Sequence, residues 1–192
     1  MEGHRGPCRY GVDASLDAEI EDLDGRIESV VVRCLAPTEA GVLQHVARDV
    51  FDHNVREDYL QAFLGDPNSL LAVAIDDGVV VGMASGLVYG HPDKPLQLFV
   101  NEVGVAPTHQ LRGLGRELVR CLLARGRELA CTEAWVATEE ENAAARRLYA
   151  ATGGREEASR TVMYTYALND DEADGVEPAV ASGATAGPIR GR

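Results

Sequence analysis

The sequence predicts one domain of mixed α/β class over residues 29–168, with a mostly antiparallel central sheet flanked by helices. Two observations predict this class. Apolar runs at residues 69–75 and 79–89 flank D-D-G at residues 76–78, a typical hairpin turn, so these two strands pair antiparallel. Nearer the C-terminus, strand and helix patterns alternate, and such crossovers favour parallel pairing.

A strand and two helices are expected before this hairpin. A β-branched run at residues 28–35 predicts the first strand. A helix is expected from Pro37 to Phe51, because proline suits a first helical turn, an acid follows it, and apolar side chains recur at helical spacing. A second, short helix is expected over residues 56–64.

The segment after the hairpin turn is predicted to hold two strands. Gly82 and Gly86 interrupt the strand at residues 79–89 and predict a bulge or a bend there. Residues 90–95 are expected to form a surface loop, and residues 96–105 form the next strand.

The C-terminal part of the domain is predicted to alternate helix and strand. The helix at residues 113–130 is the best defined, because its leucines and valines make one apolar stripe opposite arginines and glutamates. A strand is expected at residues 132–138, and a helix at residues 142–151 stops at two glycines. The alternating residues 160–168 predict a last strand.

The charge balance restricts the partners. The chain of 192 residues carries a net charge of −13, which argues against nucleic acid and against an anionic membrane surface, since both need clustered Lys and Arg. An acidic surface suits a cationic partner. Much of the acidity lies at the ends: residues 1–28 hold eight acids and residues 169–192 hold five, so both ends are expected to be disordered, solvated tails.

Cysteine usage favours a reducing, cytoplasmic setting. The four cysteines are Cys8, Cys34, Cys121 and Cys131. They form no C-x-x-C pair and no histidine lies at zinc-ligand spacing, so no metal site is expected. Cys121 and Cys131 lie among apolar residues and are expected to be buried thiols. No apolar run has the length of a membrane span, and the first residues lack the apolar core of a signal peptide.

Residues 101–117 are the most informative segment. Gln110, Arg112, Gly113 and Gly115 form the pattern Q-x-R-G-x-G at the start of the amphipathic helix. A helix start presents unpaired N–H groups at its positive end, which is a site for phosphate. The segment is not a P-loop, because no G-K-[ST] follows, and it lacks the third glycine of a Rossmann fingerprint. Glycines that only allow close packing of helix and strand are the alternative.

In this context the sequence resembles the GCN5-related N-acetyltransferases, which use acetyl-coenzyme A (acetyl-CoA). Residues 110–115 resemble their pyrophosphate turn, and residues 98–105 resemble their central strand, which splays from its neighbour so that pantetheine docks on exposed backbone groups. The family's second motif, N-x-x-A-x-x-L-Y-x-x-x-G, is matched from Asn142 to Gly153. The resemblance covers about residues 30–168 and implies that family's fold and cofactor.

The resemblance also implies the cofactor contacts. Backbone groups of Val103 and Val105 would meet pantetheine, and Asn142 would both cap its helix and contact the coenzyme. The side chain of Arg112 would add charge to the phosphate site, whereas for Arg116 surface solubility is an equal alternative. The residues of the pyrophosphate turn are Gln110, Leu111, Arg112, Gly113, Leu114, Gly115 and Arg116.

The resemblance to the GCN5-related N-acetyltransferases also implies two catalytic residues. Glu102 is the candidate general base, because the attacking amine must lose a proton. It could instead hold a cationic substrate, or be a plain structural glutamate on a strand. Tyr149 is the candidate general acid for the departing thiolate, and its alternative is a core tyrosine on an amphipathic helix.

A closer resemblance points to the class I aminoglycoside 3-N-acetyltransferases. It rests on residues 50–53 and 71–82, on the strand end N-E-V-G-V-A, and on W-V-A-T-E-E-E followed by L-Y. It departs at Asn101, which replaces an aromatic residue, and at residues 110–112, which replace a more basic triplet.

This closer resemblance implies an aminoglycoside 3-amino group as acceptor. The acids expected to hold that cation are Asp52, Glu57, Glu139, Glu140 and Glu141. A solvated loop that favours the next helix N-terminus is the alternative for the last three. A peptide N-terminus, a lysine or a polyamine remain open as acceptors, as does a non-catalytic acyl-CoA sensor. A homodimer is compatible with the family, in which dimers are common.

Overall fold

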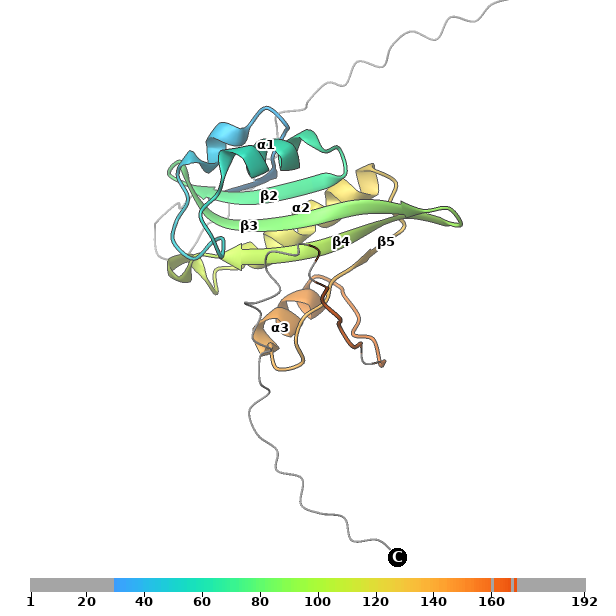
Figure 1. Cartoon of the computed structure of the whole chain (residues 1–192). Coiled ribbons are helices and arrows are strands. Elements are labelled where there is room, and N and C mark those ends of the chain that lie inside the picture. Colours follow the sequence, from blue (N-terminus) through green and yellow to red (C-terminus); the bar gives the residue numbers. More distant parts are fainter. Residues whose placement is uncertain (1–29, 160, 167, 169–192) are drawn as a thin grey trace, which may run out of the picture. The chain divides into compact units, whose positions relative to one another are not determined.

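The computed structural model describes residues 30–159, 161–166 and 168. The fold is a sheet of five strands in the order β1-β2-β3-β4-β5, in which β1 to β4 pair antiparallel and β5 pairs parallel to β4 (Figure 1). The predicted α/β class is therefore confirmed. The strands are β1 (Val31–Cys34), β2 (Ser69–Asp76), β3 (Val79–His91), β4 (Lys94–Val105) and β5 (Glu133–Trp135).

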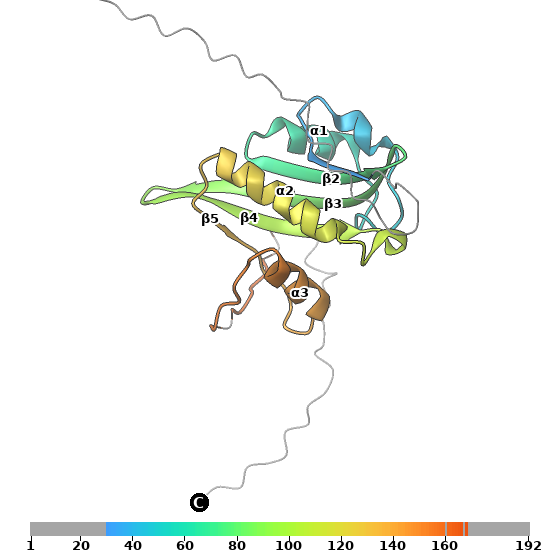
Figure 2. The same ribbon diagram turned by 180° about the vertical axis from the view of Figure 1, so that it is seen from behind.

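Helices lie on both faces of this sheet. One face carries α1 beside β2, and Figure 2 shows α2 crossing β2, β3 and β4 on the opposite face. None of the helices in the described ranges has the length and apolarity of a membrane span. The helices are η1 (Ala40–Gln44) and η2 (Pro107–His109), both 3-10, and α1 (Glu57–Gly65), α2 (Leu114–Glu128) and α3 (Ala143–Ala151).

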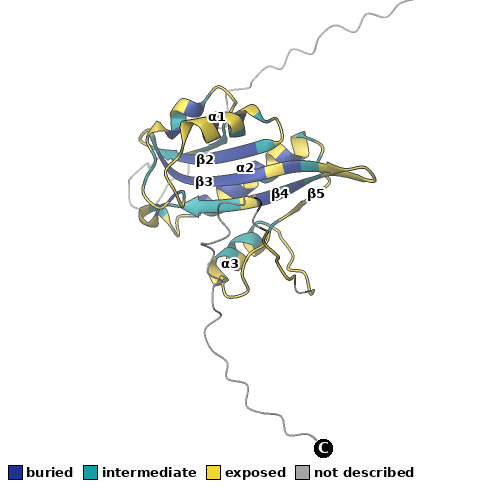
Figure 3. Ribbon diagram, in the orientation of Figure 1, coloured by how far each residue is buried: buried dark blue, intermediate teal, exposed yellow. Residues whose placement is uncertain are grey.

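The core is centred on β2 and β3. Five successive residues of β2, Leu70 to Ala74, are buried, which is the pattern of a strand covered on both faces (Figure 3). On α2, Leu118 and Leu122 are fully buried against the sheet. The register shifts opposite Gly82 and at Gly86, which confirms the bulges predicted from these glycines.

The predicted helix from Pro37 to Phe51 is wrong beyond the short 3-10 helix η1. Past His45 the chain runs along β3 instead of coiling. The N–H of Ala47 donates to the carbonyl of Val80 at 2.9 Å, and the N–H of Val80 donates to the carbonyl of His45 at 2.8 Å. A backbone that bonds to a strand cannot also form helical hydrogen bonds, so tertiary pairing overrides the local periodicity.

The other differences concern strand lengths. The β3–β4 hairpin continues to His91 and Lys94, so the loop predicted at residues 90–95 shrinks to a turn at residues 92–93. At the other edge β5 is shorter than predicted, because it pairs with β4 only at residues 97–99.

The described residues from Glu156 onward belong to a second compact unit. The strand predicted at residues 160–168 is wrong for residues 161–166, which form no regular element, and the side chains of Tyr164 and Tyr166 are exposed. Alternation predicts only the side on which each residue of a strand points. A strand also needs a partner for its backbone, and these residues have none in the part described. Arg160 and Ala167 lie outside the described residues, as do Glu28 and Ser29 of the first predicted strand.

Candidate active site

The sheet opens between β4 and β5. Pairing with β5 ends at Phe99, and among the described residues no strand lies beside the rest of β4 on that edge. The N–H of Ala106 donates to the carbonyl of Val81 at 2.9 Å, so alternate residues of β4 direct their backbone groups toward β3. Val103 and Val105 are the intervening residues, and their backbone groups face the opening. This is the side on which the sequence analysis expects them to meet pantetheine.

The turn that follows β4 has two left-handed residues. Leu111 has φ 63° and Gly113 has φ 87°, and the side chain of Leu111 is fully exposed. The carbonyl of Gly113 accepts the N–H groups of Arg116 at 3.0 Å and Glu117 at 3.3 Å. The N–H groups of Leu114 and Gly115 precede these, and groups at that position have no partner within the helix. They point outward at the positive end of α2, which attracts an anion.

Some side chains of the turn are placed to meet a phosphate, and others make structural contacts. Arg116 folds back over the turn, since a Cβ on Gly113 would lie 3.1 Å from its Nη2 atom. Gln110 has a structural contact: its side-chain amide donates to the carbonyl of Val105 at 3.0 Å. A Cβ on Gly115 would lie 3.4 Å from Leu148, so this glycine also lets α3 pack against α2. Gly115 therefore allows close packing of the two helices, in addition to its predicted place in the phosphate-binding turn.

The opening suits a long, flexible thioester with an anionic end. A cleft of about 290 Å³ lies between β4, α2, β5 and α3 beside the paired part of β4; Leu98, Val100 and Leu123 form part of its apolar wall, and the residues that line it do not include Glu102, Val103, Val105 or the turn at residues 110–116. The phosphate turn adds outward amides and Arg116, with Arg112 between the two left-handed residues. The amides and arginines of this turn suit the pyrophosphate of acetyl-CoA, and the backbone groups of Val103 and Val105 suit its pantetheine.

Glu102 and Asp52 lie close enough to interact electrostatically, although fifty positions separate them in the chain. Glu102 is half-buried on β4, opposite Ser85. Two residues on, Gly104 packs against the segment that carries Asp52, because a Cβ there would lie 2.2 Å from the carbonyl oxygen of Val50. Burial raises the pKa of Glu102, and the negative charge of Asp52 raises it further. A carboxylate in this state is a stronger base than an exposed one.

Tyr149 lies on α3 and lines the cleft. Burial raises the pKa of its phenol, and the negative charge of Glu139 raises it further. The phenol therefore keeps its proton at neutral pH. Asn142 caps α3, as predicted, because its side-chain oxygen accepts the N–H of Ala145 at 3.0 Å.

Asp52 and the other predicted acids are exposed, unlike Glu102. The carbonyls of Glu139 and Glu141 accept the N–H groups of Asn142 and Ala143, and that of Glu140 accepts from the guanidinium of Arg146 at 3.1 Å. The carboxylate of Glu57 accepts a hydrogen bond from Gln61 on its own helix at 2.8 Å. The charge of Asp52 thus acts on Glu102 and the charge of Glu139 acts on Tyr149, whereas Glu57 interacts with Gln61 of its own helix.

The sequence analysis did not anticipate two features near Glu102. One is the contact of Gly104 with Val50, for which the only signal is a glycine between valines in a strand. The other is a hollow of about 630 Å³ formed by η1 and the segment after it, which Arg48, Asp52 and His53 line together.

Comparison with known proteins identifies the family. The sequence profile of the acetyltransferase (GNAT) family matches residues 41–153. The chain belongs to this family. It is an enzyme that uses acetyl-CoA as acetyl donor for an amine, as the two sequence motifs predicted.

Relatives with similar sequences carry acetyltransferase names. An L-2,4-diaminobutyric acid acetyltransferase of Nocardia farcinica is 29% identical over 140 residues, which cover 71% of this chain and 70% of the relative. An uncharacterized N-acetyltransferase of Mycobacterium tuberculosis is 28% identical over 127 residues, covering 66% of this chain and 78% of the relative.

Solved structures show the same fold at low sequence identity. An aminoglycoside acetyltransferase from an uncultured soil metagenomic sample, in complex with sisomicin, aligns with a TM-score of 0.64 and 18% identity over 73% of this chain and 97% of that one. The aminoglycoside N-acetyltransferase AAC(6')-Iy in complex with CoA aligns with a TM-score of 0.59 and 22% identity, over 75% and 99%. These likenesses support the GNAT fold.

Proposed function

We propose that this enzyme acetylates a primary amine of a small molecule that carries more than one cationic amine. The observation that carries the proposal is the pair of carboxylates, Glu102 and Asp52, beside the open edge of β4. One carboxylate takes a proton from the reacting amine while the other attracts a second ammonium group. Relatives named for diaminobutyric acid and for aminoglycosides act on acceptors of this kind.

The bound acetyl-CoA supplies an activated acetyl group, and the residues of the chain do the rest. Glu102, with its raised pKa, removes a proton from the acceptor ammonium directly or through a water molecule. The N–H of Val103 faces the opening, where it can donate a hydrogen bond to the oxygen that becomes negative. Tyr149 keeps its phenol proton and donates it to the departing sulfur. The amine attacks directly, so no side chain becomes acetylated.

Two acceptor classes are supported by different observations. The motifs shared with class I aminoglycoside 3-N-acetyltransferases favour an aminoglycoside and its 3-amino group. The solved structures do not favour that position, since one of them is named for the 6' position and all are too distant in sequence to carry specificity. The relative at 29% identity favours a small diamino acid instead.

A panel of amines tests the proposal. Coenzyme A release is followed with a gentamicin-type aminoglycoside, L-2,4-diaminobutyrate, spermidine and a peptide with a free N-terminus, and each product is identified by mass spectrometry. We expect the aminoglycoside or the diamino acid to accelerate release at least tenfold over the rate without acceptor. Acceleration by the peptide alone would remove the small-amine proposal. Coenzyme binding with no turnover on any amine would point to a sensor.

We also propose a cytoplasmic location and a homodimer. The free thiols of Cys34, Cys121 and Cys131 suit a reducing compartment. Cell fractionation tests the first, and light scattering of the purified chain tests the second.

A further inference from the structure

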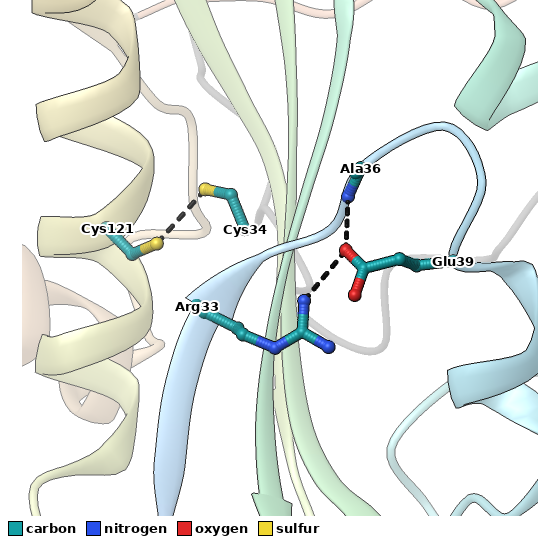
Figure 4. A network of polar contacts seen from close by, with 5 residues as sticks. All are labelled: Arg33, Cys34, Ala36, Glu39 and Cys121. Carbon is teal, nitrogen blue, oxygen red and sulfur yellow. Dashed lines mark hydrogen bonds and ion pairs between the residues drawn. The ribbon is translucent and has the colours of Figure 1, made fainter. Parts of the chain in front are cut away.

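Two cysteines meet away from the active site. Cys34 is the last residue of β1, and Cys121 lies near the middle of α2. Their sulfur atoms are 3.0 Å apart although 87 positions separate them in the chain (Figure 4). Both are free thiols and both are half-buried, as is Cys131, so the prediction that Cys121 and Cys131 are buried is wrong for both. A small reagent can therefore reach them.

We propose that Cys34 and Cys121 are a site of reversible oxidation, at which a peroxide converts the two thiols into a disulfide that ties β1 to α2. A disulfide has an S–S bond of roughly 2.05 Å, so the sulfur atoms must approach by about 1 Å. Neither cysteine is among the residues that line the cleft beside Tyr149.

The surroundings assign different roles to the two sulfurs. The hydrogen bond between the thiols lowers the pKa of Cys121, whereas that bond and burial raise the pKa of Cys34. Cys121 is therefore the thiol that ionises first. The charged groups that act on the pair are Arg125 and Glu128 on the following turns of α2, which are joined by an ion pair of 2.7 Å.

The oxidation balances in two steps. The Cys121 thiolate attacks one oxygen of hydrogen peroxide, the O–O bond breaks, and the leaving hydroxide is protonated to water. The sulfenic acid on Cys121 is then attacked by the sulfur of Cys34, and the S–O bond breaks with loss of a second water that carries the proton of Cys34. Two thiols lose two electrons and one peroxide gains them. A thiol reductant reverses the bond.

The other described cysteine is less suited to this reaction. Cys131 lines the cleft, and burial raises the pKa of its thiol. It has no sulfur partner among the described residues. Cys131 is thus a matched control within the same molecule.

Peptide mapping tests the proposal on the full chain. The protein is treated with hydrogen peroxide, free thiols are alkylated, and trypsin digestion without reduction precedes mass spectrometry. Cleavage after Arg33, Arg48, Arg120 and Arg125 places the two cysteines in residues 34–48 and 121–125. We expect these two peptides joined as the main oxidised product, and separated again by dithiothreitol, while Cys131 stays alkylated. Linkage of either cysteine to Cys8 or Cys131, or no linkage at all, would overturn the proposal.

Variants and melting give a second measurement. C34S and C121S should lose the linked peptide, and C131S should keep it. The oxidised wild-type protein should melt at least about 5 °C above the reduced one, because the bond closes a long loop. This comparison uses a single sequence and so does not depend on the folding of any variant. An oxidised protein that carries the bond but melts with the reduced form would show that the bond does not restrain β1 against α2.

Discussion

Replacement of Gly104 by alanine should destabilise the protein and loosen the site at the same time. A Cβ at this position would lie 2.2 Å from the carbonyl oxygen of Val50, and real Cβ atoms essentially never come within 3.0 Å of a neighbour. The neighbour is backbone, so β4 and the segment at Val50 must separate by about 1 Å to relieve the overlap. Asp52 follows Val50 by two residues and must move with it.

The size of the effect follows from that overlap. Overpacking of this kind costs about 1–3 kcal/mol. In a protein of this size each kcal/mol lowers the melting temperature by roughly 2–4 °C, so Gly104→Ala should melt about 2–12 °C below the wild type. The KM for a cationic acceptor should rise, because Asp52 is displaced from Glu102.

Calorimetry of two alanine variants measures this. Gly41 on η1 is the matched control, since nothing lies within 4 Å of an added Cβ and its backbone is not left-handed. Gly41→Ala should melt about 1–4 °C above the wild type, because an unstrained glycine-to-alanine change stabilises a protein by roughly 0.4–1 kcal/mol. If Gly104→Ala melts together with Gly41→Ala, the contact between β4 and the Val50 segment is not as close as described.

Three further substitutions test separate parts of the site. Asp52→Asn should move the acidic limb of the kcat/KM profile to lower pH, because activity is lost as the base Glu102 is protonated and the charge of Asp52 raises the pKa of Glu102. The control Glu57→Gln, within α1, should leave this limb where it is. A limb that moves equally in both variants would contradict the interaction of Asp52 with Glu102. Tyr149→Phe should lower kcat about 100-fold with unchanged acetyl-CoA affinity, as for loss of a general acid; an unchanged kcat in single-turnover assays would make Tyr149 a packing residue. Asn142→Ala removes the cap of α3 and should cost about 1 kcal/mol in urea unfolding, whereas an unchanged unfolding midpoint would mean that the cap contributes nothing.

Local patterns predicted much of the fold. The hairpin at residues 76–78, the amphipathic helix α2 and the capped helix α3 depend on turn chemistry and periodicity, which neighbouring residues determine. The helix predicted up to Phe51 failed for the opposite reason. Its apolar residues are spaced as in a helix, yet the chain satisfies its backbone along β3 at Val80, and that partner cannot be seen in the local sequence.

The candidate site shows the same division. The turn at residues 110–116 and Glu102 lie in one segment, so a motif could propose both from the sequence. The proximity of Asp52 to Glu102 depends on how the Val50 segment crosses β4, and the thiol contact of Cys34 with Cys121 depends on how α2 packs on β1. No spacing rule within the chain predicts such contacts, because they arise from the tertiary arrangement.

One comparison tests the general-base role of Glu102 most directly. Acetyl transfer by the wild type and by Glu102→Gln is measured with the best amine of the panel, together with acetyl-CoA affinity by calorimetry and the melting temperature. Burial raises the pKa of Glu102 in the folded protein, so the fold favours the protonated carboxyl, and the stability that this form contributes is lost as the pH rises through that pKa. Because glutamine is neutral at every pH, Glu102→Gln should melt no lower than the wild type at neutral pH. We expect turnover to fall about 100-fold or more with unchanged coenzyme affinity. Turnover within about twofold of the wild type at neutral pH would contradict a general-base role for Glu102.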